Sequence, residues 1–281
     1  MREGSGRDAA RREMKVIAFM FHDVVARGAY DTSGFPGPGA DHYKLDSGEF
    51  EEHCRAIANV APPGAVRLID PGDPGGGGGA TPIVPLTFDD GGRSAYEHIA
   101  DVLEARGWRG LFFVTTDYVG APAFLTSEQI RALRARGHGV GTHSCSHPDR
   151  MHLLPWGQLV REWTRSVRIL SDLLGEPVTT GSVPGGCYSG AVARAAAEAG
   201  IRVLFTSRPT ATPRFADGCL VLGRYAIRRG MAPTTTASLA AGRLPPRLRE
   251  AAWWNAKRVA NALGGTYYGS LRKFLLERLQ S

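Results

Sequence analysis

Two short stretches carry most of the chemical information in this chain: Thr87-Phe88-Asp89-Asp90-Gly91 and Thr142-His143-Ser144-Cys145-Ser146-His147-Pro148. Together they supply two adjacent carboxylates and two imidazoles four positions apart. A catalytic site for a divalent metal ion commonly has three protein ligands and leaves its other positions to water. A fourth group beside that water can serve as a general base. The two stretches therefore predict an open metal site, although an Asp-Asp-Gly-Gly sequence is also typical of a simple turn.

Each stretch follows a predicted strand. Residues 83–88 end at the acidic pair, and residues 140–142 lead directly to His143. A third run, residues 16–21, ends at His22-Asp23 and has the continuous apolar character of a buried parallel strand. Functional groups of parallel barrels gather at the carboxyl ends of the strands. We therefore expect these polar residues to meet on one rim.

Helical and strand patterns alternate along the chain between these stretches. Repeated β-α units are typical of an α/β fold with a parallel sheet or barrel. The residues from 27 to 48 and from 71 to 82, the latter with five consecutive glycines, predict loops. The expected helices cover residues 49–58 (with Ser47 as a candidate cap), 94–106, 126–136, 154–174 and 190–199, and further strands cover 110–115 and 202–206.

The chain divides into three parts by composition. Residues 1–13 are polar and arginine-rich and predict a disordered basic tail, and residues 14–241 form the main domain. Residues 242–281 form a basic, aromatic extension that contains Trp253-Trp254. We interpret the extension as helices packed on the barrel. Peripheral membrane contact through residues 247–279 is the alternative.

Size and composition are those of an ordinary globular protein. The chain has 281 residues, of which 43% are hydrophobic and 22% charged, and no run approaches the ~20 apolar residues of a membrane helix. The start lacks the apolar core of a signal peptide, so we expect a cytoplasmic protein, with membrane association as the alternative. The four cysteines form no C-x-x-C pair, and we expect them to be reduced.

The net charge of +7 suits an anionic partner, such as a nucleotide- or lipid-linked sugar, an acidic glycan or a membrane surface. Scattered arginines explain the same charge equally well. Because no recognised DNA- or RNA-binding motif accompanies the charge, we expect no nucleic-acid partner.

The paired motifs resemble those of the NodB-type polysaccharide deacetylases (carbohydrate esterase family 4), whose core runs through TFDDG and H-[ST]-x-x-H-[PS]. The resemblance covers roughly residues 16–230. It implies a distorted (β/α) barrel with fewer than eight strands, related to the TIM barrel. It also implies hydrolysis of an N-acetyl group on an amino sugar.

The same resemblance assigns roles to the residues of the two motifs. Asp89 would be the general base, and Asp90, His143 and His147 would hold one divalent ion, with zinc first and Ni²⁺, Co²⁺ or Mn²⁺ as alternatives. The ion would polarise the amide carbonyl and activate a water. Cys145 occupies a variable position of the family motif and is not an expected ligand.

The third motif of the family, R-x-P-[YW], matches only in part, as Ser182-Val183-Pro184-Gly185-Gly186. Pro184 and the backbone N–H of Gly185 could still form an oxyanion hole. Ser182 replaces the arginine that normally orients the base. From its chain position, Arg224 is the candidate replacement.

The histidine that protonates the leaving amine in the family is also missing, because no histidine follows His152. An arginine cannot take this role, since its pKa is too high for ready proton donation. We prefer His22 as the catalytic acid, with His152 and Tyr188 as further candidates. The alternative for His22 is a structural role at the rim.

Three functions remain open on these residues. The first is N-deacetylation of an N-acetylated sugar in a polysaccharide, a glycoconjugate or a small intermediate. The second is hydrolysis of another C–N bond on the same fold, such as that of a formamide. The third is a catalytically silent carbohydrate-binding relative, favoured by the missing late histidine and arginine but not by the complete Asp/Asp/His/His set.

Overall fold

The computed structural model describes residues 15–69 and 82–263, with side chains as far as residue 256. The predicted tail over residues 1–13 and nearly all of the glycine-rich segment 71–82 therefore lie outside the described residues, as does the end of the aromatic extension.

In the described part of the chain, nine strands form the main sheet, in the order β11-β1-β4-β5-β6-β7-β8-β10-β9. Neighbouring strands are parallel throughout, except that β9 and β10 form an antiparallel pair. The strands are β1 (Ala18–Phe21), β4 (Leu86–Phe88), β5 (Leu111–Val114), β6 (Gly139–Thr142), β7 (Thr180–Ser182), β8 (Val203–Phe205), β9 (Arg214–Ala216), β10 (Cys219–Leu222) and β11 (Arg224–Ala226). A small parallel pair joins β2 (Val24–Val25) to β3 (Leu45–Asp46).

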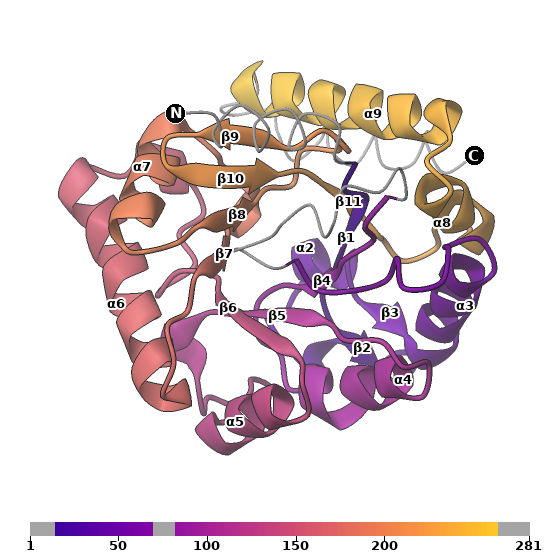
Figure 1. The fold of residues 1–281 in the computed structure, drawn as a ribbon, viewed down its shortest axis with the longest axis horizontal. Helices are drawn as coiled ribbons and strands as arrows, with labels where there is room; N and C mark the ends of the chain where they lie inside the picture. The colour runs from indigo at the N-terminus through magenta and orange to yellow at the C-terminus, as the bar shows by residue number, and fades with distance from the viewer. Residues whose placement is uncertain (1–14, 70–81, 264–281) are drawn as a thin grey trace, which may run out of the picture.

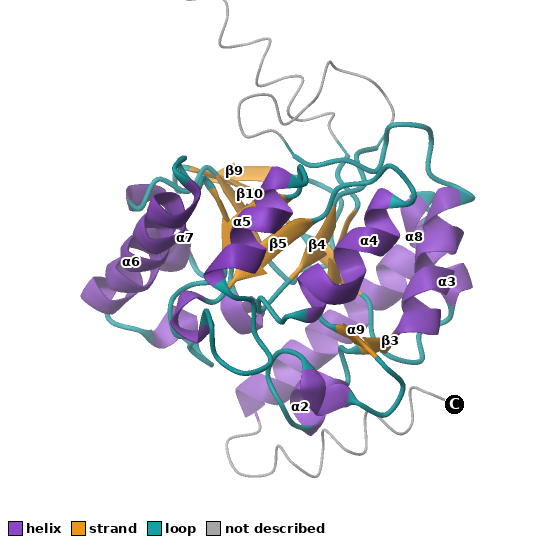
Figure 2. Ribbon diagram, turned by 90° about the horizontal axis from the view of Figure 1, so that it is seen from below, coloured by secondary structure: helices purple, strands orange, loops and turns teal. Residues whose placement is uncertain are grey.

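Helices surround the strands (Figure 1). Figure 2 shows α6 and α7 together on one side of the strands and α3, α4 and α8 on the other. The helices are α2 (Pro38–Asp41), α3 (Ser47–Ala58), a π-helical turn (Ala95–Ile99) that continues into α4 (Ala100–Glu104), α5 (Ser127–Ala135), α6 (Trp156–Leu174), α7 (Gly190–Glu198), α8 (Pro233–Ala240) and α9 (Leu244–Leu263).

The predicted α/β class with a mostly parallel sheet is confirmed, but the predicted number of strands is too low. Three short strands, β9, β10 and β11, lie within residues 214–226 and are separated by Gly218 and Gly223. Arg214, Gly218, Gly223 and Arg224 interrupt this stretch, and its apolar run at residues 219–222 is too short to predict a strand by itself. Within the described part of the chain, the end strands β11 and β9 do not pair, so hydrogen bonding does not close the barrel.

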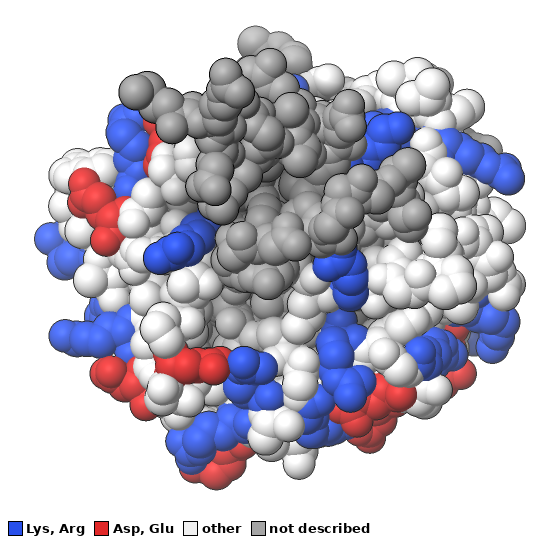
Figure 3. All heavy atoms as spheres, in the orientation of Figure 1, with Lys and Arg blue, Asp and Glu red and all other residues white. Residues whose placement is uncertain are grey.

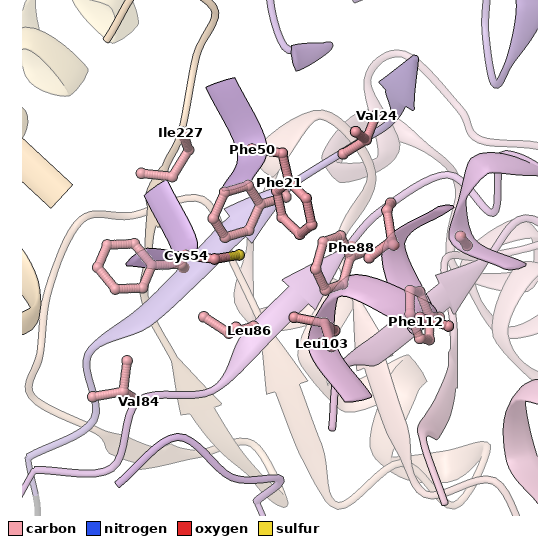
Figure 4. Packing of buried hydrophobic residues seen from close by; sticks show 14 of the residues in the cluster. Phe21, Val24, Phe50, Cys54, Val84, Leu86, Phe88, Leu103, Phe112 and Ile227 are labelled. Carbon is pink, nitrogen blue, oxygen red and sulfur yellow. The ribbon is translucent and has the colours of Figure 1, made fainter. Parts of the chain in front are cut away.

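Alternation along the strands divides the core into two layers. Phe21, Phe88 and Phe112 pack outward beneath the helices, in one cluster with Phe50 and other residues of α3 and α4 (Figure 4). The opposite faces of the strands contribute to a separate buried cluster that includes Phe113 and Phe205. Because successive strand residues point to opposite sides, Thr87 and Asp89 point away from the layer of Phe88. The same strand therefore serves both the core and the site.

The hydrogen bonds at the helix starts confirm the predicted cap of α5 and show that the predicted cap of α3 is wrong. Thr126 caps α5 by accepting a hydrogen bond from the backbone N–H of Gln129 (3.3 Å), as the predicted capped helix requires. The cap of α3 is Asp46 and not Ser47. Asp46 accepts from the backbone N–H of Glu49 (2.9 Å), and the Glu49 carboxylate accepts from the backbone N–H of Asp46 (3.2 Å). Ser47 is already the first helical residue.

The segment predicted as one loop, residues 27–48, also has local structure. It contains a 3-10 turn (Tyr30–Thr32), the short helix α2 and the strand β3. Elements of two to four residues give too little periodicity to detect in a segment rich in glycine, proline and aspartate.

The C-terminal helix α9 packs on the body through ion pairs and rings. Arg228, which follows β11, donates two hydrogen bonds to Glu250 of α9 (3.0 Å each), and its guanidinium lies 4.3 Å from the centre of the Trp253 ring. Arg247 donates to the Tyr225 hydroxyl (3.0 Å). The division into a domain over 14–241 and an extension over 242–281 stays a prediction.

Charges of both signs share the surface. On the face in Figure 3, acidic and basic side chains lie next to one another along the lower edge. The four cysteines all lie in the described residues, and no disulfide joins them. Within the described residues, no helix is both long and apolar enough to cross a bilayer.

Candidate metal centre

Strand register brings the predicted polar residues to one rim. Phe21 of β1 lies beside Phe88 of β4, so the following residues, His22 and Asp89, leave the sheet at the same level. The backbone N–H of Asp89 donates to the carbonyl of Phe21 (3.0 Å). The next residue after β6, His143, donates its backbone N–H to the carbonyl of Val114 at the end of β5 (2.8 Å).

Three side chains converge as a metal-ligand set. The Asp90 Oδ1 atom lies 3.5 Å from His143 Nε2 and 3.6 Å from His147 Nε2, and one ligand atom from each residue lies within 4.8 Å of the others. Ligand atoms about 2.1 Å from a tetrahedral zinc ion are about 3.4 Å apart. The separations and the nitrogen and oxygen donors therefore fit a divalent ion of this size.

The protonation states of these three residues also favour the binding of a cation. Burial, followed by the nearby charges of Asp89 and Asp23, raises the pKa of Asp90 well above its ordinary value, so a positive ion would relieve an unfavourable buried carboxylate. Burial lowers the pKa of His143 to about 3 and also lowers the pKa of His147. Both imidazoles are thus neutral near pH 7, which is the form that binds a metal.

The ligand loop has an irregular backbone, as Pro148 and the Ser-Cys-Ser interior predict. Asp90, Ser144 and His147 all have positive φ angles (75°, 65° and 56°), which are uncommon for residues other than glycine and frequent at functional sites. The backbone N–H of Ser144 donates to the Thr142 hydroxyl (3.1 Å), and that of His147 donates to the Ser144 hydroxyl (3.2 Å). Local hydrogen bonds thus hold the turn between the two imidazoles.

The orientation of His143 is set by β7. Its Nδ1–H donates to the backbone carbonyl of Ser182 (2.9 Å), which leaves the Nε2 lone pair toward Asp90 and His147. Hydrogen bonds of this kind commonly fix the tautomer of a metal-binding histidine.

Arg224 reaches Asp89 through the interior of the barrel. It is the first residue of β11 and is fully buried, and its two Nη atoms donate to the two carboxylate oxygens of Asp89 at 2.7 and 2.8 Å. Such a two-point contact fixes both distance and orientation. The structure therefore places Arg224 where the sequence argument needed a replacement for the missing arginine.

Further contacts fix the Arg224 side chain along its length. Its Nε donates to the carbonyl of Thr206 (3.1 Å), and Nη1 donates to the Thr87 hydroxyl (3.0 Å). The guanidinium lies 5.7 and 5.9 Å from the ring centres of Phe113 and Phe205. Contacts with Thr206, with Thr87 and with two aromatic rings thus fix the position of the guanidinium.

Ser182 joins this network, which the sequence argument did not anticipate. Its hydroxyl accepts from Arg224 Nη2 (2.8 Å) and donates to Asp89 Oδ2 (3.2 Å). The sequence offered one indication of this role, because Ser182 ends a buried strand at the position of the motif arginine. The residue does not carry the charge itself but connects the arginine to the carboxylate.

Opposing effects set the charge of Asp89. Burial by itself would raise the pKa of this carboxyl, but the positive charge of Arg224, with smaller contributions from His143 and His22, brings the pKa below its ordinary value. Asp89 is therefore ionised at neutral pH, in contrast to Asp90 beside it. Two adjacent carboxyls with opposite pKa shifts are typical of a site with divided roles.

His22 lies close enough to the centre to interact electrostatically with Asp89, Arg224 and His147. Burial lowers its pKa to about 4, so the imidazole is neutral near pH 7. Its Nδ1 is buried and has no hydrogen-bond partner among the described residues, and its ring centre lies 4.9 Å from that of Tyr43. The structure thus brings His22 to the site in an uncharged form.

The third-motif residues form a tight turn after β7. Pro184 is buried, and Gly185 has φ 58° and ψ 8°, in the left-handed region that favours glycine. The two further candidates for the acid differ from His22. His152 is exposed, and the Tyr188 hydroxyl accepts a hydrogen bond from Arg214 (2.8 Å).

Comparison with known proteins finds similarity over the part of the chain that carries the site. Residues 77–204 match the family model described as polysaccharide deacetylase. The Bacillus subtilis protein YxkH is 28% identical over 148 residues, which are 53% of this chain and 52% of YxkH. The matched segment, which contains Asp89, Asp90, His143 and His147, is similar to the polysaccharide deacetylase family. The resemblance inferred from the two motifs is thereby confirmed.

Two further comparisons show a shorter similar segment and a similar fold. The chitooligosaccharide deacetylase of Sinorhizobium fredii is 38% identical over 73 residues, or 26% of this chain and 32% of that protein. The structure of IcaB from Ammonifex degensii superposes with a TM-score of 0.63 at 22% identity, over 81% of this chain and 97% of that chain. The chain spans about half the length of YxkH and less of the chitooligosaccharide deacetylase.

Proposed function

We propose that this protein is a metal-dependent hydrolase that removes the N-acetyl group from an N-acetylated amino sugar. The observation that carries the proposal is the pairing of one convergent ligand set, Asp90, His143 and His147, with a separate carboxylate, Asp89, held by Arg224. A relative named as a chitooligosaccharide deacetylase supports the choice of substrate class.

Asp90, His143 and His147 would hold the ion, for which we propose zinc, with Ni²⁺, Co²⁺ or Mn²⁺ as alternatives. Two imidazole nitrogens and one carboxylate oxygen suit these metals better than Mg²⁺ or Ca²⁺, which prefer oxygen ligands. When bound, the ion would polarise the amide carbonyl and make a nearby water more acidic.

Asp89 would accept the proton of the attacking water. Its ionised state suits that role, but its lowered pKa makes it a weak base that does not retain a proton. The proton therefore needs a second acceptor. Arg224 would orient the carboxylate and keep it charged when the site closes around a neutral amide.

His22 would deliver a proton to the leaving amine. Since the imidazole is neutral near pH 7, it must gain a proton during the reaction, and the electrostatic attraction to Asp89 favours that protonated form. The backbone N–H of Gly185, in the turn that the buried Pro184 begins, would bind the developing oxyanion, a contribution commonly worth ~3 kcal/mol per donor.

The substrate would be part of a polysaccharide or glycoconjugate or a small amino-sugar intermediate, and the net charge of +7 favours a nucleotide- or lipid-linked form. Leu244 and Leu248 of α9 are 63% and 66% exposed and lie beside Arg243 and Arg249, which supports peripheral contact with an anionic membrane. We propose that the reaction takes place in the cytoplasm.

Acyl-group selectivity tests the proposed reaction. Zinc-loaded protein is incubated with oligomers of N-acetylglucosamine and with matched N-formylated oligomers, and the released acetate and formate are measured. We expect faster release of acetate. Faster release of formate would move the activity to another C–N bond, whereas tight binding of both oligomers without release would indicate a carbohydrate-binding protein.

A further inference from the structure

Glu162, a residue of α6, lies outside every motif and yet holds the loop between the two histidine ligands. Its Oε2 accepts hydrogen bonds from the backbone N–H groups of Cys145 (2.9 Å) and Ser146 (3.0 Å). Its Oε1 accepts from the Ser146 hydroxyl (2.8 Å). One carboxylate therefore binds two consecutive residues that lie between His143 and His147.

The loop needs such support because its backbone departs from regular structure. Ser144 and His147 have positive φ angles, and a conformation of this kind persists only when surrounding contacts enforce it. On the carbonyl side, the backbone N–H groups of Thr116 and Asp117 donate to the carbonyls of Ser144 (3.2 Å) and Cys145 (3.0 Å). Glu162 binds the same loop from its N–H side, so the loop is held from both sides.

We propose that Glu162 is a positioning residue that fixes the separation of the His143 and His147 imidazoles and thereby sets the affinity of the site for its divalent ion. The inference rests on the proposed metal site. It assigns part of the metal affinity to a side chain that does not touch the ion, by way of the backbone of Cys145 and Ser146.

Arg165 provides a matched control on the same helix. It lies three residues after Glu162 and pairs with Asp117 (2.8 Å), in the turn that binds the loop from the carbonyl side. Its side chain has no hydrogen bond to residues 144–147 among the described contacts. Removal of Arg165 therefore changes the charge and exposure of the helix while the direct contacts to the loop remain.

The test measures zinc affinity by competition with a chelator for wild type, Glu162→Ala, Glu162→Gln and Arg165→Ala. Loss of a group that orients a metal ligand weakens binding about 10- to 100-fold, and we expect this for Glu162→Ala. Glu162→Gln keeps an oxygen that can accept from both backbone N–H groups, and we expect a change below about threefold. Arg165→Ala should bind like wild type.

Two further readouts separate positioning from general stability. The visible absorption spectrum of the Co²⁺-loaded protein reports ligand geometry and should change in Glu162→Ala but not in Arg165→Ala. The Tm of the metal-free proteins should differ little. If Glu162→Ala does not fold, Glu162→Asp, which shortens the reach by one methylene, should show the weaker binding.

The outcomes distinguish this inference from the proposed function. Zinc affinity in Glu162→Ala equal to that of wild type, or a lowered metal-free Tm with unchanged affinity, would overturn the positioning role alone. A wild-type protein that binds no divalent ion would instead overturn the metal site, and the proposed function with it.

Discussion

Asp89 and Arg224 form a fully buried ion pair in the centre of the candidate site. Removal of one partner from such a pair commonly costs about 3–5 kcal/mol, because the other charge stays buried without compensation. The five N–H donors of Arg224 contact Asp89, Ser182, Thr87 and Thr206. The arginine thus supports the protein and its candidate base at the same time.

The Asp89–Arg224 pair should determine the pH below which the activity falls. In wild type the pKa of Asp89 is lowered, so activity should not fall through protonation of Asp89 until the pH is well below the ordinary aspartate range. In Arg224→Met burial acts without the arginine and raises the pKa, so the acid limb should move to higher pH. The pH dependence of kcat/KM in wild type and Arg224→Met tests this shift.

Arg224→Lys is the control, since it keeps the charge but not the two-point contact. We expect its acid limb to lie between those of wild type and Arg224→Met. Identical pH profiles for all three proteins would contradict an electrostatic role of the arginine at Asp89.

Replacement of His22 should lower the activity without loss of the bound metal. Removal of a general acid typically lowers the rate by 10²–10⁴-fold, and we expect a decrease of about 100-fold in kcat for His22→Gln. Metal content should stay at the wild-type level, because His22 is not in the ligand set. Full activity in His22→Gln would remove the residue from the mechanism and leave it a structural role at the rim.

His53, far from the candidate site in the fold, predicts a pH dependence of stability. It is buried between α3 and α8, where Nδ1 lies 2.8 Å from the Thr236 hydroxyl, and burial lowers its pKa to about 4. The unfolded chain takes up this proton below about pH 6.5 and the folded chain only below about pH 4. Stability should therefore fall as the pH drops through this window, by about 1.4 kcal/mol per pH unit for this group.

His53→Asn places a similar polar atom at the position of Nδ1 without a titration. We expect the free energy of unfolding of wild type to fall about 2 kcal/mol more than that of His53→Asn between pH 7 and pH 5. Denaturant unfolding at the two pH values measures the difference. An equal pH dependence of the free energy of unfolding in wild type and His53→Asn would contradict a lowered pKa of His53 in the folded protein.

At the scale of elements, the ends of strands were predictable and short elements were not. The predicted strands correctly indicated β1, β4 and β6 and placed His22, Asp89 and His143 after them. The run before His22 is the clearest, because a buried strand favours a continuous apolar stretch. Arg224 was a candidate only from its position in the chain, because its contacts with Asp89 and Ser182 join residues that are far apart in the sequence. The sequence around Arg224 contains no pattern that predicts these contacts.

The start of α3 predicts a measurable difference between neighbouring residues. Asp46 makes the capping hydrogen bonds with Glu49, whereas Ser47 lies within the helix. Loss of a cap costs ~1 kcal/mol, so we expect Asp46→Ala to lower the free energy of unfolding by about that amount. Ser47→Ala is the matched control and should change it by less than about 0.5 kcal/mol. A larger effect of Ser47→Ala would contradict the assigned cap.

At the scale of the whole molecule, the barrel collects groups from distant parts of the chain around one point. Asp89 and Asp90 follow β4, the two histidines follow β6, Ser182 ends β7 and Arg224 begins β11. The sequence indicated the members of this set that belong to motifs. Ser182 stands in the partial third motif, but its contacts could not be predicted, and neither could those of Glu162. Both residues act through tertiary contacts to backbone and carboxylate atoms, which do not follow from spacing along the chain.

The central claim is that a divalent ion on Asp90, His143 and His147 acts with Asp89 to release acetate from an amino sugar. It is tested most directly by metal content and acetate release measured together for wild type and Asp89→Asn. We predict about one bound divalent ion per chain in both proteins and acetate release that is lost only in Asp89→Asn. Acetate release by Asp89→Asn at the wild-type rate, or a wild-type protein without bound metal, would contradict the account.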